Sequence, residues 1–110
     1  MLNPTTTLLK GPLRSLYCDD PDLMDIITLF IEELPTRVTL LEAAYSRGDL
    51  TETSRLAHQL NGSSGGYGFP LLGEAAAAVE HHARLHDHVS LHDAIVVFSQ
   101  LATSIKDVTP

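Results

Sequence analysis

Apolar residues recur three and four positions apart along most of the chain, a spacing that predicts amphipathic helices. The first run begins near Leu23, with Asp20 as the expected N-cap and Pro21 as the first helical residue. Pro35 interrupts this run and the pattern resumes after it, so we expect one long helix with a kink at Pro35. Its predicted buried stripe comprises Leu23, Ile26, Ile27, Phe30, Ile31, Leu34, Val38, Leu41 and Tyr45.

Further helices follow after short connections. Arg47-Gly48 ends the first helix, and Asp49, with Glu52 three residues later, is a variant of the capping box that starts the second. The second helix is expected to fray around Gly65-Gly66, and a third begins near Pro70. The predicted stripes are Leu71, Leu72, Ala75, Val79 and Ala83 in the third helix, and Leu91, Ile95, Phe98, Leu101 and Ile105 in a fourth that starts at Ser90-Leu91-His92-Asp93.

No stretch alternates apolar and polar residues over a useful strand length, and no internal repeat is evident. Four amphipathic helices with short loops predict an all-α fold, an antiparallel four-helix bundle. We expect one domain over residues 1–110, with the bundle in 20–108 and a short N-terminal helix or cover segment in 1–19. Leucines in that segment would face the bundle: Leu8, Leu9, Leu13 and Leu16.

The second predicted helix carries a histidine on its polar side. Leu56, Leu60, Ser63, Ser64 and Tyr67 share one helical face, and His58 lies roughly 200° around the helix from it, toward solvent. Gly62 follows one turn later on the same exposed side, although glycine in a helix costs about 1 kcal/mol relative to alanine. The missing side chain therefore suggests that a partner approaches His58.

Composition narrows the function classes. The chain has 110 residues, 44% of them hydrophobic, and a formal charge of −7, which argues against nucleic-acid binding. Its single cysteine, Cys18, excludes an intramolecular disulfide and fits a reducing compartment. No apolar run is long enough to cross a membrane, so we expect a cytoplasmic protein that does not bind membranes. We also expect the protein to be a monomer.

An exposed imidazole is a nucleophile in its neutral form, which is abundant near pH 7. Phosphoryl transfer requires mainly positioning and charge stabilisation from the protein. A histidine held on a rigid helix meets the positioning requirement. Because the chain has no glycine-rich loop followed by lysine, we expect it neither to bind ATP nor to begin the chemistry itself.

The motif of residues 57–64, Ala-His-Gln-Leu-Asn-Gly-Ser-Ser, with Gly68 ten residues after the histidine, resembles the histidine-containing phosphotransfer (HPt) domain of bacterial two-component phosphorelays. Residues 30–35, the Gly48-Asp49 turn and residues 72–80 are also similar to that family. The likeness covers most of residues 20–100.

The resemblance implies that His58 accepts a phosphoryl group from the aspartate of a receiver domain and later passes it to another receiver. The partners would be receiver domains of response regulators or hybrid histidine kinases, and any Mg²⁺ would belong to the receiver, leaving no cofactor or metal here. Gly62 would clear space for the receiver, and Gly68 would shape the turn after the helix. The expected docking residues around the histidine are Arg55, Gln59, Asn61, Gly62 and Gly65.

One position departs from the family pattern, which commonly has lysine three residues after the histidine. Asn61 stands there, and its amide can donate a hydrogen bond but carries no charge. Arg55, three residues before His58, is our candidate to replace part of that charge.

Several residues have competing interpretations. A receiver-binding adaptor that no longer transfers phosphate is one alternative, and a histidine-rich metal-binding bundle using His82, His86, His88 and His92 is another. Ser64 shares the core side with Leu60, where we expect its hydroxyl to bond back to the preceding turn rather than act as a nucleophile. Glu32-Glu33 is interpreted as a solvated face.

Overall fold

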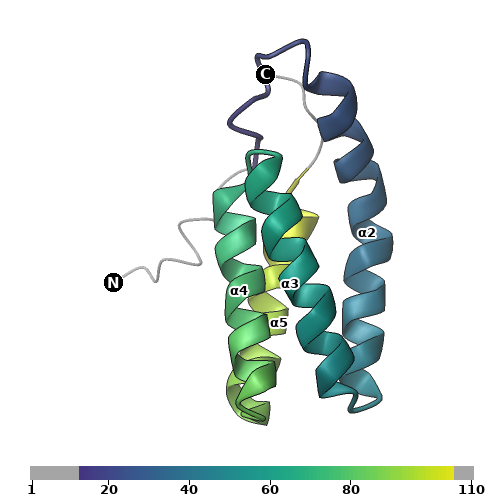
Figure 1. Cartoon of the computed structure of the whole chain (residues 1–110), viewed down its shortest axis with the longest axis vertical. Coiled ribbons are helices and arrows are strands. Elements are labelled where there is room, and N and C mark those ends of the chain that lie inside the picture. The colour runs from purple at the N-terminus through teal and green to yellow at the C-terminus, as the bar shows by residue number, and fades with distance from the viewer. Residues whose placement is uncertain (1–12, 106–110) are drawn as a thin grey trace.

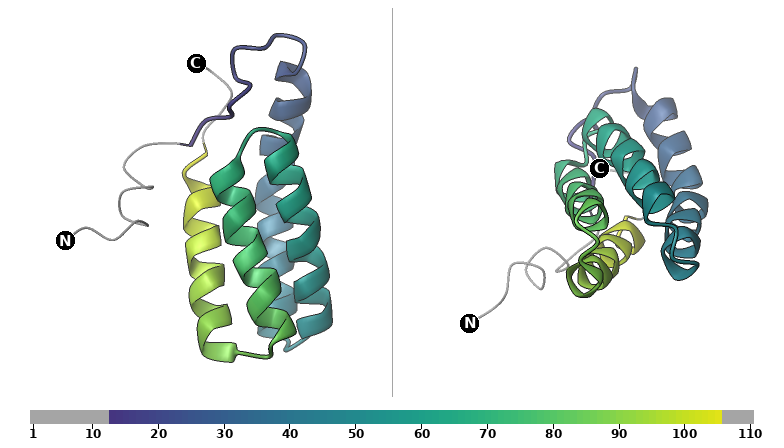
Figure 2. Two further views of the ribbon diagram at one scale, coloured as in Figure 1. Left: turned by 60° about the vertical axis from the view of Figure 1, so that its left-hand side comes forward. Right: turned by 60° about the horizontal axis from the view of Figure 1, so that its bottom comes forward.

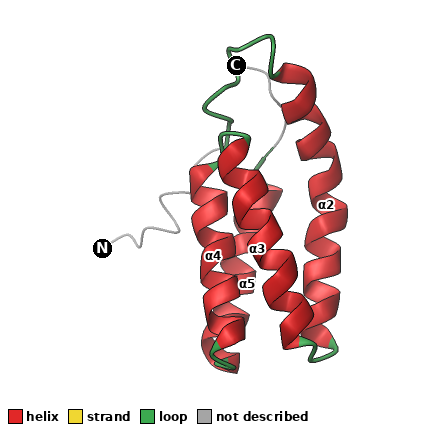
Figure 3. Cartoon of the chain, viewed as in Figure 1, coloured by secondary structure: helices red, strands yellow, loops and turns green. Residues whose placement is uncertain are grey.

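The structure is a computed structural model that describes residues 13–105. Within that range the chain forms four helices and no strand: α2 (Met24–Ser46), α3 (Leu50–Gly66), α4 (Pro70–Arg84) and α5 (His88–Thr103). Figure 1 and Figure 3 show them running alongside one another as a bundle. The predicted all-α four-helix bundle is confirmed.

The helices close into a ring, since α3 packs against α2 and α4, and α5 packs against α4 and α2. Connections of residues 47–49, 67–69 and 85–87 are so short that successive helices run antiparallel. The two turned views in Figure 2 show the same neighbours side by side. This places α3 between α2 and α4, so each flank of α3 faces a different helix.

The predicted stripes form the core or pack against it, with two exceptions. Leu71, in the predicted stripe of α4, is half-buried and lies outside the core. Ile26 belongs to the predicted stripe of α2 but is 46% exposed, whereas Ile27 and Phe30 are buried. Every residue of the stripe predicted for the fourth helix is buried, including Ile105, which follows the end of α5 at Thr103. The fully packed side chains come from all four helices and include Leu41, Leu60, Leu72, Val79, Leu91, Phe98 and Leu101. The aromatic rings of Phe30, Tyr67 and Phe69 stack at one end of this core.

Two predicted helix starts are wrong by a few residues. α2 begins at Met24, not at Pro21, because Asp20 closes a preceding turn: its Oδ1 accepts from Asp22 N–H at 3.0 Å and its carbonyl from Leu23 N–H at 3.1 Å. α5 begins at His88, not at Ser90, because the Asp87 carboxylate accepts a hydrogen bond from Ser90 N–H at 3.1 Å. In both cases the hydrogen bonds of an aspartate before the helix, rather than the apolar pattern, determine where the helix begins.

Other predicted boundaries are confirmed. α2 continues unbroken through Pro35 and ends at Ser46, and Gly48 follows it with a φ of +76°. Asp49 caps α3 by accepting from Glu52 N–H at 3.0 Å. α3 ends at Gly66, and α4 begins at Pro70. The site-bearing helix is therefore fixed at both ends.

The segment before α2 crosses the turn between α3 and α4. Leu16 N–H donates to Gly68 O at 2.8 Å, and the Ser15 hydroxyl donates to Tyr67 O at 2.6 Å. In Figure 1 this segment arches over the end of the bundle before it joins α2. Leu13 packs against the core as predicted, but the prediction for Leu16 is wrong, since it is 72% exposed. The part of the predicted cover segment in residues 1–12, with Leu8 and Leu9, lies outside the described residues, as does the predicted end of the bundle beyond residue 105.

Candidate functional site

His58 lies near the middle of α3 with 70% of its side chain exposed, as its position on the polar side predicts. The buried face of α3 is centred differently from the prediction. Its fully buried members are Thr53, Ala57, Leu60 and Ser64, whereas Leu56 is only half-buried. The imidazole lies on the flank of α3 that faces α4, since it contacts a residue of that helix.

The His58 ring contacts a carboxylate on the neighbouring helix. Its Nδ1 atom lies 3.1 Å from Oε2 and 3.3 Å from Oε1 of Glu80, on α4. The Glu80 side chain is only 11% exposed. An ionised carboxylate can only accept hydrogen bonds, so this contact favours the tautomer with the proton on Nδ1 and the lone pair on Nε2.

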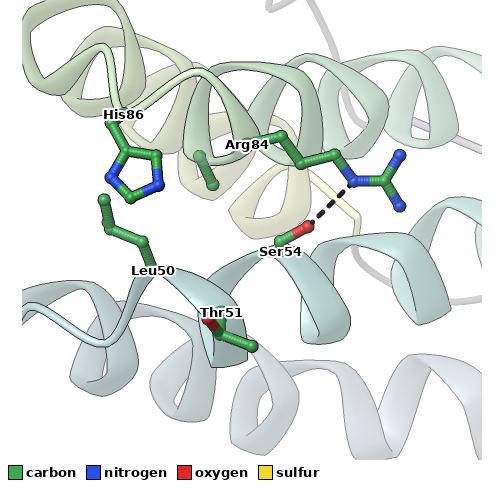
Figure 4. Close-up of a pocket in the computed structure, with 6 residues that line it drawn as sticks. Leu50, Thr51, Ser54, Arg84 and His86 are labelled. Carbon is green, nitrogen blue, oxygen red and sulfur yellow. Dashed lines mark hydrogen bonds between the residues drawn. The ribbon is translucent and has the colours of Figure 1, made fainter.

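Arg84 completes this arrangement from one turn further along α4. Its Nη2 atom lies 2.6 Å from Glu80 Oε2, and its Nε donates to the Ser54 hydroxyl on α3 at 3.3 Å. Figure 4 shows the Arg84 side chain extending along α4 toward Ser54. A buried or half-buried carboxylate is stabilised by such a charge-assisted pair.

Sequence reasoning did not identify Glu80 and Arg84 as site residues. A signal for Glu80 was nevertheless present, because it lies four residues after Ala76 and three before Ala83, both on the buried face of α4. A carboxylate in a core-facing position needs a partner. For Arg84 the only signal was its spacing of four residues from Glu80.

Arg55 is not brought to the His58 ring by any hydrogen bond or ion pair in the structure. It donates from Nε and Nη2 to the Glu52 carboxylate, at 2.6 and 2.7 Å. This pair lowers the pKa of Glu52 and raises that of Arg55, in both cases chiefly through the side-chain hydrogen bond. The guanidinium of Arg55 is thus paired in the first turn of α3, rather than placed beside His58 as we expected.

The remaining motif residues divide between two flanks of α3. Asn61 is half-buried and faces α4, where a Cβ added to Gly73 would lie 3.3 Å from its carbonyl O and its Oδ1. Gln59 lies on the other side, in a groove between α3 and α2 that is also lined by Arg37, Leu40, Leu56 and Leu60. The Arg37 Nη2 donates across this groove to the Ser63 hydroxyl at 3.4 Å.

The glycines of the motif differ in what surrounds them. Gly62 and Gly65 are exposed, and a Cβ added to either would meet nothing within 4 Å. Gly68 is buried with a φ of +88°, and a Cβ there would clash with Ser15 Oγ and lie 2.8 Å from Leu16 N. Packing therefore requires glycine at Gly68 but not at Gly62.

The Ser64 hydroxyl does not behave as predicted. Ser64 is fully buried on the core face, but its Oγ has no hydrogen-bond partner among the described residues. The expected bond to the preceding turn is therefore wrong. Burial also separates the hydroxyl from any substrate in solvent.

The histidines of the metal-binding alternative are spread over two helices and the loop between them. His82 lies on α4, His86 follows that helix with a φ of +57°, and His88 and His92 lie on α5. His92 Nδ1 is 3.4 Å from the Tyr45 hydroxyl. Within residues 13–105, no group of three or more His, Cys, Asp and Glu side chains could hold a metal ion.

Comparison with known protein families gives a match to the Hpt domain over residues 25–108, which covers the bundle and its exposed histidine. The chain belongs to the Hpt domain family. Domains of this family carry phosphoryl groups in two-component signalling and interact with receiver domains. Comparisons with curated proteins and with solved structures give no match. Among the described residues, no helix is long and apolar enough to span a membrane.

Proposed function

We propose that this domain relays a phosphoryl group between the aspartates of two receiver domains, with His58 as the phosphoacceptor. The observation that supports the proposal is the contact between His58 Nδ1 and Glu80, which favours an Nε2 lone pair on a side chain that is 70% exposed. The neighbouring residues of α3 leave this side of the helix open, since neither Gly62 nor Gly65 has a side chain.

The transfer step follows from that geometry. Nε2 attacks the phosphorus of the receiver's aspartyl phosphate, the N–P bond forms, and the P–O bond to the aspartate breaks with the electron pair leaving on the carboxylate. The Nδ1 proton stays on the ring, which becomes positively charged. A carboxylate bonded to Nδ1–H stabilises such an imidazolium, as the triad aspartate of serine proteases does. Onward transfer reverses the step when the second receiver's carboxylate attacks the phosphorus.

Receiver docking would extend from His58 across the flank that faces α2. Gln59 and Leu40 line the groove there, and the Leu40 side chain is 53% exposed. Leu29 and Ile26, on the same helix, are also exposed apolar residues. Exposed apolar side chains beside polar ones are typical of protein-binding surfaces. Arg55, Asn61 and Gly65 would complete the contact around the histidine.

The test is label transfer from a phosphorylated receiver, for which the wild-type domain is expected to acquire acid-labile, base-stable phosphate. His58→Gln should lose the label and still bind the receiver. His88→Gln is the matched control, because His88 is an exposed histidine on α5. Binding without label in the wild-type domain would instead identify the adaptor, and label retained in His58→Gln would refute this phosphoacceptor.

A further inference from the structure

The carboxylate that contacts His58 is also bound by an arginine on α4, not by one on the motif helix. Arg84 Nη2 and His58 Nδ1 meet at the same atom, Oε2 of Glu80, at 2.6 and 3.1 Å. Three other arginines bond to different residues: Arg55 to Glu52, Arg37 to Ser63 and Arg47 to Asp49. Arg84 contacts the carboxylate of the site directly.

Arg84 is itself held by both helices. It extends from α4, and its Nε donates to Ser54, which lies four residues before His58 on the same side of α3. Figure 4 shows this bridge between the two helices. A guanidinium fixed at two points limits the rotamers that Glu80 can adopt without losing its partner.

We propose that Arg84 is a positioning residue for phosphoryl transfer: it holds the Glu80 carboxylate against His58 Nδ1, and through it sets the tautomer that presents Nε2. This inference rests on the proposed function. Arg84 also offsets the negative charge of Glu80, which would otherwise repel a phosphoryl group approaching the imidazole a few ångströms away. The offset matters in a chain whose formal charge is already −7.

Two measurements on the chain of residues 1–110 separate this role from the proposed function. The first is a long-range ¹H–¹⁵N NMR spectrum of the neutral imidazoles. It measures the fraction of His58 molecules that carry the ring proton on Nδ1. The second is the rate of transfer from a phosphorylated receiver at saturating receiver concentration. Arg84→Met keeps most of the apolar stem and removes the charge and the donors. Arg84→Lys restores a charge and a donor.

We expect Arg84→Met to lower the Nδ1–H share and to slow saturated transfer about tenfold, the equivalent of one charge-assisted hydrogen bond. Arg84→Lys should recover most of both. Arg47→Met is the control, because Arg47 is an exposed arginine paired with Asp49, at the start of α3. Arg84→Met also removes a partner of the largely buried Glu80 carboxylate, so its thermal unfolding midpoint should fall by several °C, and transfer rates are compared well below both midpoints.

A double-mutant cycle tests whether Arg84 acts through Glu80. In a Glu80→Gln background, Arg84→Met should add little further loss, since the group that it positions is already altered. Fully additive losses would overturn the proposal, as would an unchanged tautomer in Arg84→Met or a loss confined to receiver affinity. If the wild-type domain accepts no phosphate, the proposed function fails. The tautomer spectrum still decides whether Arg84 and Glu80 orient His58.

Discussion

The Nδ1 atom of His58 on α3 and the Oε2 atom of Glu80 on α4 lie 3.1 Å apart, although 22 positions separate the residues in sequence. Glu80 is 11% exposed and His58 is 70% exposed, so the contact joins a largely buried carboxylate to a solvent-facing ring. Burial and the ion pair with Arg84 hold the carboxylate, and the carboxylate in turn restrains the exposed ring. The helix pair therefore orients an imidazole that remains accessible to another protein.

Replacing the Glu80 carboxylate with a neutral amide of the same shape tests whether phosphoryl transfer depends on the contact with His58. Glu80→Gln keeps the shape of the side chain but cannot stabilise positive charge on the imidazole, so we expect phosphoryl transfer to His58 to slow by about tenfold. Transfer rates from a phosphorylated receiver provide the measurement. Glu74→Gln, an exposed substitution on α4, is the control and should leave the rate unchanged. A Glu80→Gln domain as fast as the wild type would show that the contact plays no part in transfer.

The cap of α5 gives a pH-dependent prediction. Hydrogen bonding from Ser90 lowers the pKa of Asp87 below its ordinary value. A carboxylate with a lowered folded-state pKa stabilises the fold above its unfolded-state pKa, and that contribution is lost as the pH falls through the folded-state value. Asp87→Ala should therefore lower the unfolding midpoint by about 4 °C at pH 7, and this difference should shrink toward pH 3.

Thermal unfolding followed by circular dichroism at both pH values measures that difference. Asp93→Ala is a suitable control, because Asp93 is an exposed residue of α5 beyond its first turn. A difference between Asp87→Ala and wild type that stays constant from pH 7 to pH 3 would mean that the cap does not act through its ionised form.

The turn after α3 depends on Gly68. Its φ of +88° and the close approach of Ser15 and Leu16 leave no room for a Cβ. Gly68→Ala should therefore lower the free energy of unfolding by about 2 kcal/mol or more, measured by urea denaturation. Gly48 has a φ of +76° but open surroundings. Gly48→Ala therefore introduces backbone strain without a steric clash, and it should lower the free energy of unfolding by about 1 kcal/mol. Equal losses at the two glycines would contradict a steric role for the cover segment.

The bundle could be predicted from sequence because the apolar spacing and the capping residues of each helix are local signals. The stripe from Leu91 to Ile105 and the Asp49 cap depend only on local spacing, and both are confirmed. The predicted start of α5 at Ser90 is wrong, because the Asp87 carboxylate caps the helix and adds residues ahead of the apolar stripe, where periodicity gives no signal.

The site could be predicted only in part, for a different physical reason. Periodicity within α3 places His58 on the exposed side, and this is what the structure has. The contact with Glu80 depends on how α3 and α4 are rotated and shifted against each other, which no pattern within one helix determines. The same limit applies to the charge: Arg55 is close in sequence, but Arg84 is the arginine that reaches the site.

A substitution at Gly62 should affect the stability of the fold and the rate of transfer in opposite directions. It is an exposed glycine inside α3, one turn after His58, and an added Cβ would meet nothing within 4 Å. Gly62→Ala should therefore stabilise the fold by about 1 kcal/mol, because alanine is the better helix former. If the open surface admits the receiver, the same methyl group should slow transfer to His58.

Urea denaturation and label transfer on the same variant test both halves of this prediction. Gly66→Ala is the matched control, since Gly66 is equally open but is the last residue of α3, two turns from His58. It should leave the transfer rate unchanged, whereas Gly62→Leu should slow transfer more than Gly62→Ala. A more stable Gly62→Ala domain that transfers at the wild-type rate would show that the receiver does not approach over this position. The docking surface would then have to lie on the flank of His58 that faces α4.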